Sequence, residues 1–146
     1  MLMNNGYNQY KQNSINTSTP EELTLMLYNG LVKYIMQAQS ALDAKNLESV
    51  NNSIIRAQDI VREFQSTLDM NYEVSQSMDI LYDYMHRRLI EANINKDSTI
   101  LTEILGMAKE LRDTWAQAMK LAKHPASPVQ TAVQKTTSSA AQTVAR

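Results

Sequence analysis

Apolar residues recur at alternating spacings of three and four through most of this chain, and this periodicity constrains the fold more than any other feature. It is clearest in the second predicted helix, whose apolar residues share one face: Leu47, Val50, Ile54, Ala57, Val61, Phe64 and Leu68. Such spacing places an apolar stripe along one side of an α-helix. With only 3 glycines and 3 prolines, and no alternating β pattern, the chain is expected to form long helices.

Four helices are predicted, over about 20–43, 47–68, 76–93 and 98–123. Thr19 caps the first, with Pro20 at the first helical position and Glu22 closing a capping box. The other start signals are Asn46, then Ser75 or Ser77, then Asp97 or Ser98. His124-Pro125 ends the last helix, because the residue before proline avoids the helical conformation. Short connections between helices of similar length predict an all-α, antiparallel, up-down-up-down four-helix bundle.

The inward faces of the other three helices follow the same spacing. They are expected to hold Leu23, Leu27, Leu31, Tyr34, Ala38 and Ala41 in the first; Met78, Leu81, Met85, Leu89 and Ala92 in the third; and Leu101, Ile104, Ala108, Leu111, Trp115, Ala118 and Ala122 in the fourth.

Two flanks lie outside the predicted bundle of residues 19–123. Residues 1–18 form a polar N-terminal arm that carries Tyr7 and Tyr10. Residues 124–146 are mostly Ala, Ser, Thr, Gln and Val, and burial of such side chains would not offset the entropy lost on ordering them. A flexible, disordered C-terminal tail is therefore expected.

Charge and composition exclude several classes of function. The formal net charge is -1, without the basic excess that nucleic-acid binding requires, so no nucleic-acid partner is expected. There are 0 cysteines, which suits a reducing cytosol. Residues 1–10 lack the basic and apolar regions of a secretory signal. The most apolar stretch, 23–36, is too short and too interrupted for membrane insertion.

No catalytic or metal-binding pattern stands out, so no enzyme activity, metal or cofactor is expected. Neither His86 nor His124 has a glutamate three residues before it, as a di-iron bundle requires. An exposed His86 beside Arg87 and Arg88 would suit a histidine phosphotransfer bundle, against the simpler reading of a surface histidine. Arg87-Arg88 would likewise suit a carboxylate clamp, against ion pairs of Arg87 with Asp83 and Glu91 on its own helix.

The first helix carries more apolar surface than its inward face explains. At about 100° per residue, a second stripe falls roughly opposite the first, formed by Leu25, Tyr28, Val32 and Met36. Further off-seam residues are Ile55, Ile60, Ile80, Tyr84 and Ile90. Uncovered stripes of this kind favour a groove for another polypeptide, and its predicted lining residues are Leu25, Tyr28, Val32, Met36, Ile55, Ile60, Ile80 and Tyr84. A wide core or a homodimer would also account for them.

The two tyrosines of the arm suggest how such a groove is protected. Tyr7 and Tyr10 are large, amphipathic side chains on a polar segment. They are predicted to fold back as an N-terminal cap on the groove until a partner displaces them.

Several runs of the sequence resemble one known family, the FliS-type flagellar export chaperones. Near the N-terminus these are Tyr10 to Asn13, Thr17 to Leu23, and Met26-Leu27-Tyr28-Asn29-Gly30. Later runs are Tyr82-Asp83-Tyr84-Met85, Arg87-Arg88-Leu89, Ala92-Asn93, Asp97, Arg112-Asp113 and Trp115. They span about residues 7–120 in the family's order.

The resemblance implies a cytosolic chaperone that binds the disordered C-terminal segment of flagellin. It implies further that the chaperone prevents premature polymerisation and delivers flagellin to the cytoplasmic domain of the flagellar type III export gate. In the family the N-terminal arm covers part of the binding surface of the free protein. The arm of this chain corresponds to the region of Tyr7 and Tyr10, and a homodimer in the absence of flagellin is a further expectation.

Overall fold

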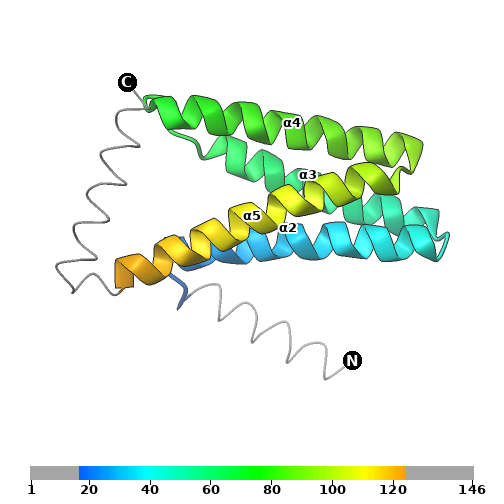
Figure 1. The fold of residues 1–146 in the computed structure, drawn as a ribbon, viewed down its shortest axis with the longest axis horizontal. Helices are drawn as coiled ribbons and strands as arrows, with labels where there is room; N and C mark the ends of the chain where they lie inside the picture. The colour runs from blue at the N-terminus through cyan, green and yellow to red at the C-terminus, as the bar shows by residue number, and fades with distance from the viewer. Residues whose placement is uncertain (1–16, 124–146) are drawn as a thin grey trace.

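The computed structural model describes residues 17–123 (Figure 1). The predicted cap residues Tyr7 and Tyr10, the tail over 124–146, and the stop signal at His124-Pro125 lie outside these described residues. The helix ranges expected within 19–123 all lie inside them.

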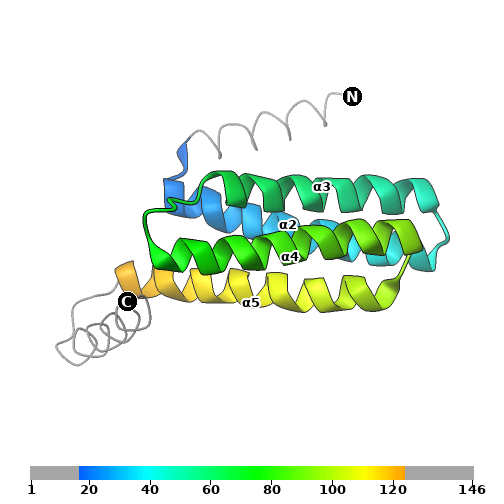
Figure 2. The ribbon, with the colours of Figure 1, turned by 90° about the horizontal axis from the view of Figure 1, so that it is seen from above.

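Four α-helices make up the described part of the chain: α2 (Pro20–Asp43), α3 (Leu47–Ser66), α4 (Glu73–Asn95) and α5 (Ser98–Lys123). Successive helices run in opposite directions along a common long axis (Figures 1 and 2). Helix α2 packs against α3 and α5, and α4 packs against the same two helices. The fold is therefore the all-α, up-down-up-down four-helix bundle that the periodicity predicts.

Side-chain caps begin three of the helices where the sequence signals them. At α2, the Thr19 hydroxyl accepts from the backbone N–H of Glu22 at 3.2 Å, and the Glu22 carboxylate accepts from the backbone N–H of Thr19 at 3.4 Å. This is the expected capping box. The Asn46 side chain caps α3, and the Asp97 carboxylate accepts from the second backbone N–H of α5 at 2.8 Å.

Helix α4 departs from the prediction at its start. It begins at Glu73, three residues before the expected range, and its N-cap residue Tyr72 makes no side-chain capping bond. The proposed caps at Ser75 and Ser77 are wrong, because both residues lie inside the helix and Ser75 is buried. The backbone N–H of Ser75 already donates to the carbonyl oxygen of Tyr72 at 3.1 Å, so the first turn begins before either serine.

The interior of the bundle confirms the predicted inward face of α3 most fully. Its buried residues are Val50, Ile54, Ala57, Val61 and Phe64. Leu47, at the outer end of the same stripe, is 55% exposed. On α5 the buried set is Ile100, Leu101, Ile104, Leu105 and Ala108, while the later seam residues Leu111 and Trp115 are half-buried. The predicted seam is thus buried through the middle of α3 and the first half of α5, and it becomes more exposed at the start of α3 and in the second half of α5.

Helix α2 contradicts the expectation of a free second stripe. Tyr28 and Val32, predicted to lie on an uncovered surface, are only 5% and 4% exposed and belong to the core. Each helix of this bundle contacts two neighbours, so α2 needs one apolar stripe toward α3 and a second toward α5. Leu25 is half-buried, and of the four predicted stripe residues only Met36 stays exposed, at 48%.

An aromatic cluster links three helices inside the bundle. The Phe64 ring of α3 stacks on Tyr28 of α2 with centroids 4.3 Å apart and on Tyr82 of α4 at 5.5 Å. The Tyr28 and Tyr82 hydroxyls form a hydrogen bond of 2.8 Å across the core, which satisfies both buried groups. Burial raises the pKa of both phenols, because desolvation disfavours the phenolate.

Candidate functional site

An apolar groove runs between the first half of α2 and the second half of α3. Its volume is about 500 Å³. It is lined by Leu23, Met26, Leu27, Gly30 and Tyr34 from α2 and by Arg56, Asp59 and Ile60 from α3. We call this set the apolar groove. The two leucines and the one methionine lining it are half-buried, so they leave apolar surface accessible along α2.

Gly30 shapes the floor of the apolar groove. It lies in the interior of α2, where a glycine costs about 1 kcal/mol relative to alanine. A Cβ atom built on Gly30 would stand 3.3 Å from Cδ1 of Ile60, closer than comfortable packing allows. The missing side chain therefore lets α3 approach α2 at this level and keeps the groove floor open.

A second, more polar groove lies at the other end of the same helix pair. It has a volume of about 700 Å³, and its lining includes Val32, Lys33, Met36 and Gln37 of α2 and Ser49 and Ser53 of α3. We call this the polar groove. Hydroxyl, amide and short aliphatic side chains dominate its lining, so it suits a ligand segment with small and polar residues better than a bulky apolar one.

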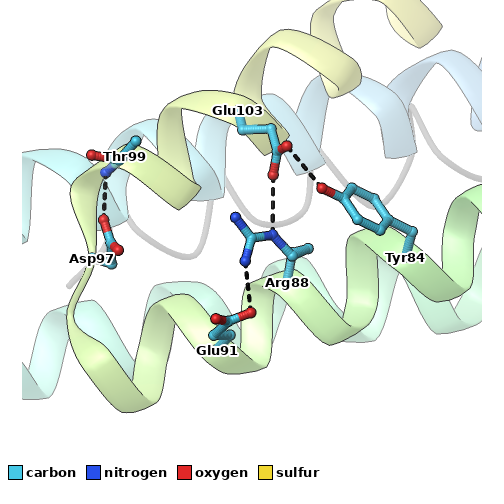
Figure 3. Close-up of polar contacts among 6 residues, drawn as sticks. All are labelled: Tyr84, Arg88, Glu91, Asp97, Thr99 and Glu103. Atoms are coloured by element: carbon cyan, nitrogen blue, oxygen red, sulfur yellow. Dashed lines mark hydrogen bonds and ion pairs between the residues drawn. The ribbon is translucent and has the colours of Figure 1, made fainter.

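A polar clasp joins α4 to α5 near the turn between them (Figure 3). The Tyr84 hydroxyl donates to one oxygen of the Glu103 carboxylate at 2.8 Å, and the Arg88 guanidinium donates to the other at 3.1 Å. Arg88 also donates to Glu91 at 2.7 Å. We call Tyr84, Arg88, Glu91 and Glu103 the α4–α5 clasp.

The hydrogen bonds of the clasp shift the pKa values of its ionisable side chains. The Tyr84 hydroxyl and the Arg88 guanidinium lower the pKa of the Glu103 carboxyl, because both donate hydrogen bonds to its charged form. The same carboxylate raises the pKa of Tyr84. Arg88 is thus committed to two carboxylates, while Arg87 pairs with Asp83 at 2.9 Å. Glu91 forms an ion pair with Arg88 and not with Arg87 as predicted. Both arginines therefore already have carboxylate partners, on α4 and, for Arg88, also on α5.

His86 does not have the exposure that a phosphotransfer histidine needs. The bundle covers most of this residue, which is only 8% exposed. Burial is the main cause that lowers the pKa of its imidazole, followed by the charge of Arg62. The expectation of a surface histidine is also wrong. Among residues 17–123, no cluster of His, Cys, Asp or Glu side chains forms a potential metal site.

The eight predicted groove residues do not come together in one place. Val32 and Met36 line the polar groove, and Ile60 lines the apolar groove. Tyr28 belongs to the core, Leu25 is half-buried and lines neither groove, and Tyr84 belongs to the clasp. Ile55 and Ile80 are 43% and 71% exposed on the outer surfaces of α3 and α4, away from both grooves.

The sequence predicts only one residue of the apolar groove, Ile60, as part of a binding surface. It predicts Leu23, Leu27 and Tyr34 as inward-facing and gives Met26 and Gly30 no place in a groove. One signal was available: a glycine in the middle of a long, otherwise strongly helical segment indicates a close approach or an opening at that point. The packing of α3 against α2 shows that Gly30 serves both as a point of close approach and as the floor of the groove.

The two grooves indicate the kind of partner that this bundle can bind. Accessible grooves along one helix pair are the kind of surface that can bind a helical polypeptide. No helix within the described residues has the length and apolar character needed to cross a membrane.

Comparison with known proteins identifies the family. The family profile described as "Flagellar protein FliS" matches residues 3–122, and the chain belongs to this family. It is 48% identical over 120 residues to the flagellar secretion chaperone FliS of Bacillus subtilis (strain 168), covering 82% of this chain and 90% of that protein. It is 29% identical over 113 residues to the flagellar secretion chaperone FliSB of Pseudomonas aeruginosa, covering 73% and 90%.

A solved structure supports the fold. The crystal structure of a bacterial flagellar chaperone superposes with a TM-score of 0.64 at 19% identity, covering 80% of this chain and 96% of that one. The chain is therefore a flagellar chaperone of the FliS family. That family is a class of chaperones and not of enzymes.

Proposed function

We propose that this chain is a cytosolic export chaperone for flagellin. It binds the disordered C-terminal segment of flagellin, prevents premature polymerisation, and delivers flagellin to the cytoplasmic domain of the export gate of the flagellar type III apparatus. Membership of the FliS family supports the general role. The observation that carries the proposal is the apolar groove, whose half-buried leucine and methionine side chains remain accessible on the outside of a folded bundle.

The groove dimensions suit a ligand that folds as it binds. The α2 wall runs from Leu23 to Tyr34, which corresponds to roughly 17 Å of helix. A ligand helix of about three turns fits beside it, with apolar residues at positions i, i+3 or i+4, and i+7 facing the groove. Ordering the segment consumes part of the favourable binding free energy, so the complex is specific but can be released at the export gate without nucleotide hydrolysis.

Titration calorimetry with a synthetic peptide of the C-terminal flagellin segment from the same organism tests this function. We expect one site per chain and a negative heat-capacity change from apolar burial. Met26→Asp, in the apolar groove, should weaken binding at least about tenfold. Ile80→Asp is the matched control: the residue is 71% exposed outside both grooves, so its substitution should change affinity less than about twofold. Absence of wild-type binding would refute the function.

The N-terminal arm has a proposed place in the same scheme. Tyr7 and Tyr10 are proposed to occupy the groove of the free chaperone until flagellin displaces them. Deletion of residues 1–12 should leave the helix content of residues 17–123 unchanged and raise the affinity for the flagellin peptide. Light scattering on the same samples distinguishes a peptide-sensitive monomer from a stable homodimer that ignores the peptide. Unchanged affinity in the deleted chain would remove the cap while leaving the chaperone function intact.

A further inference from the structure

The arginines of the described helices differ in whether their guanidinium groups form hydrogen bonds. Four of them donate hydrogen bonds to a neighbouring carboxylate or amide: Arg62 to Gln65, Arg87 to Asp83, Arg88 to Glu91 and Glu103, and Arg112 to Asp113. Arg56 is the remaining arginine between residues 17 and 123. Its exposed guanidinium has no hydrogen bond or ion pair among these residues.

Arg56 also has a distinctive position, because it lines the apolar groove. Asp59, three residues later on the same face of α3, lines it too, and the two side chains form no ion pair within 4.0 Å of each other among the described contacts. The α2 wall of the groove carries only uncharged side chains. One wall therefore offers apolar contact, while the other offers a separated cation and anion.

The register of the two helices places these charges along the groove. Ile60 is level with Gly30. Because α2 and α3 are antiparallel, Arg56 lies toward Tyr34 and Asp59 lies near Gly30. The two charged residues are offset by roughly 4.5 Å along the axis of α3. Two residues that are three apart on a ligand helix with its axis parallel to α3 are separated by about the same distance along that axis.

We propose that Arg56 binds a carboxylate of the helical ligand, and that Asp59 beside it binds a cationic or amide side chain, so the apolar groove selects its ligand by the order of its charges. The inference rests on the proposed function and adds a ligand feature to it. The partner is an amphipathic helix whose apolar face is flanked by an Asp or Glu, with a Lys, Arg or amide side chain three or four residues away.

Arginine is suited to this role. Its planar guanidinium binds a carboxylate through two parallel hydrogen bonds, which fixes orientation as well as adding attraction. The partly apolar surroundings of the groove remove water around the pair when the ligand is bound. A ligand helix with the two charges reversed would bring like charges together at both positions, so the groove would favour one direction of the helix over the other.

The experiment compares two arginines of the same helix. Full-length chaperone is titrated with the C-terminal flagellin peptide at low salt, as wild type, as Arg56→Glu, and as Arg62→Glu. Arg62 is also exposed on α3 but lies outside the groove. We expect Arg56→Glu to weaken binding about tenfold and Arg62→Glu to change it less than about twofold. Far-ultraviolet circular dichroism checks that both variants remain folded.

A charge-swap series makes the test specific to an ionic contact. Each acidic residue of the peptide is replaced in turn by lysine, and each peptide is titrated against wild type and Arg56→Glu. One substitution should weaken binding to wild type about tenfold and restore binding to Arg56→Glu. Equal affinities of the Arg56→Glu and Arg62→Glu variants, or no restoring peptide, would overturn this inference and leave flagellin binding standing. A wild-type chain that does not bind the peptide overturns both.

Discussion

The α2–α3 pair and the α4–α5 pair both contribute to the apolar core, but they differ in the extent of their interfaces and in the polar contacts across them. Helices α2 and α3 approach each other over an extensive apolar contact, closely enough at Gly30 and Ile60 that a side chain would not fit easily. Helices α4 and α5 share the least extensive of the four helix interfaces and diverge away from their connecting turn (Figure 1). Their described polar links are those of the clasp at Glu103.

The more extensive α2–α3 interface makes this pair better suited to hold a ligand. A groove can hold a ligand helix in a fixed geometry only if its walls do not move, and an extensive apolar contact provides such walls. Both grooves lie along α2–α3. The α4–α5 interface is less extensive, and the hydrogen bonds across it lie at exposed charged groups that add little stability, so opening there costs less. We therefore expect the binding surface to sit on the pair that resists deformation.

The largest expected effect concerns core leucines on the two pairs. Leu31 of α2 is fully buried, whereas Leu81 of α4 is half-buried. Leu31→Ala should lower the free energy of unfolding by about 3 kcal/mol, and Leu81→Ala by about 1 kcal/mol. Urea denaturation followed by circular dichroism measures both. Equal losses would show that the two pairs contribute alike and would break the comparison.

The buried tyrosine pair gives the next largest effect. Tyr28→Phe or Tyr82→Phe leaves the partner hydroxyl without its hydrogen bond inside the core, at a cost of about 1–2 kcal/mol each. The double variant removes both hydroxyls and should cost clearly less than the sum of the two. A double-mutant cycle from urea denaturation measures this coupling, and strict additivity would contradict a direct contact between α2 and α4.

Substitution at Gly30 is expected to affect the stability of the bundle and its affinity for the peptide in opposite directions. Gly30→Ala should gain up to about 1 kcal/mol from helix propensity, partly offset by the contact with Cδ1 of Ile60. The same methyl group narrows the apolar groove, so flagellin-peptide affinity should fall about threefold to tenfold. Gly106→Ala, with open space around its Cβ position on α5, is the matched control and should leave affinity unchanged. Tighter binding by Gly30→Ala would show that the groove is not used.

The smallest expected effect lies at the clasp. Glu103→Gln should lower Tm by about 3 °C at low salt and by less at 1 M salt, since exposed ion pairs are screened. Asp83→Asn, which removes the Arg87 pair within α4, should change Tm by less, because that pair joins no second helix. A larger loss for Asp83→Asn would show that the clasp does not hold α4 to α5.

The clasp also predicts a pH dependence. The pKa of Glu103 in the folded chain lies below its ordinary value of 4.5. Its contribution is therefore present above pH 4.5 and is lost as the pH falls through the folded-state pKa. Thermal unfolding from pH 6 to pH 3 should show a smaller fall in Tm for Glu103→Gln than for wild type. Parallel curves for the two proteins would exclude this carboxylate as the source.

Local sequence signals determined much of the fold. The capping box at Thr19 and Glu22 and the caps at Asn46 and Asp97 depend on atoms within a few residues of one another, so they are legible in the sequence. The α3 seam was legible as well, because a helix with one clear stripe has one clear inward direction. Family membership followed from residue runs whose order the profile match supports.

The site was decided only by how the helices pack. Periodicity showed that α2 has two apolar stripes, but it did not show that Tyr28 and Val32 are buried in the assembled bundle while the surface beside Met26 and Gly30 stays open. It did not show that His86 is buried. Which stripe meets a neighbour depends on contacts between residues far apart in the chain. The sequence determined which surfaces are apolar, and the tertiary structure decided which of them remain for a partner, because burial belongs to the assembled helices and not to any one of them.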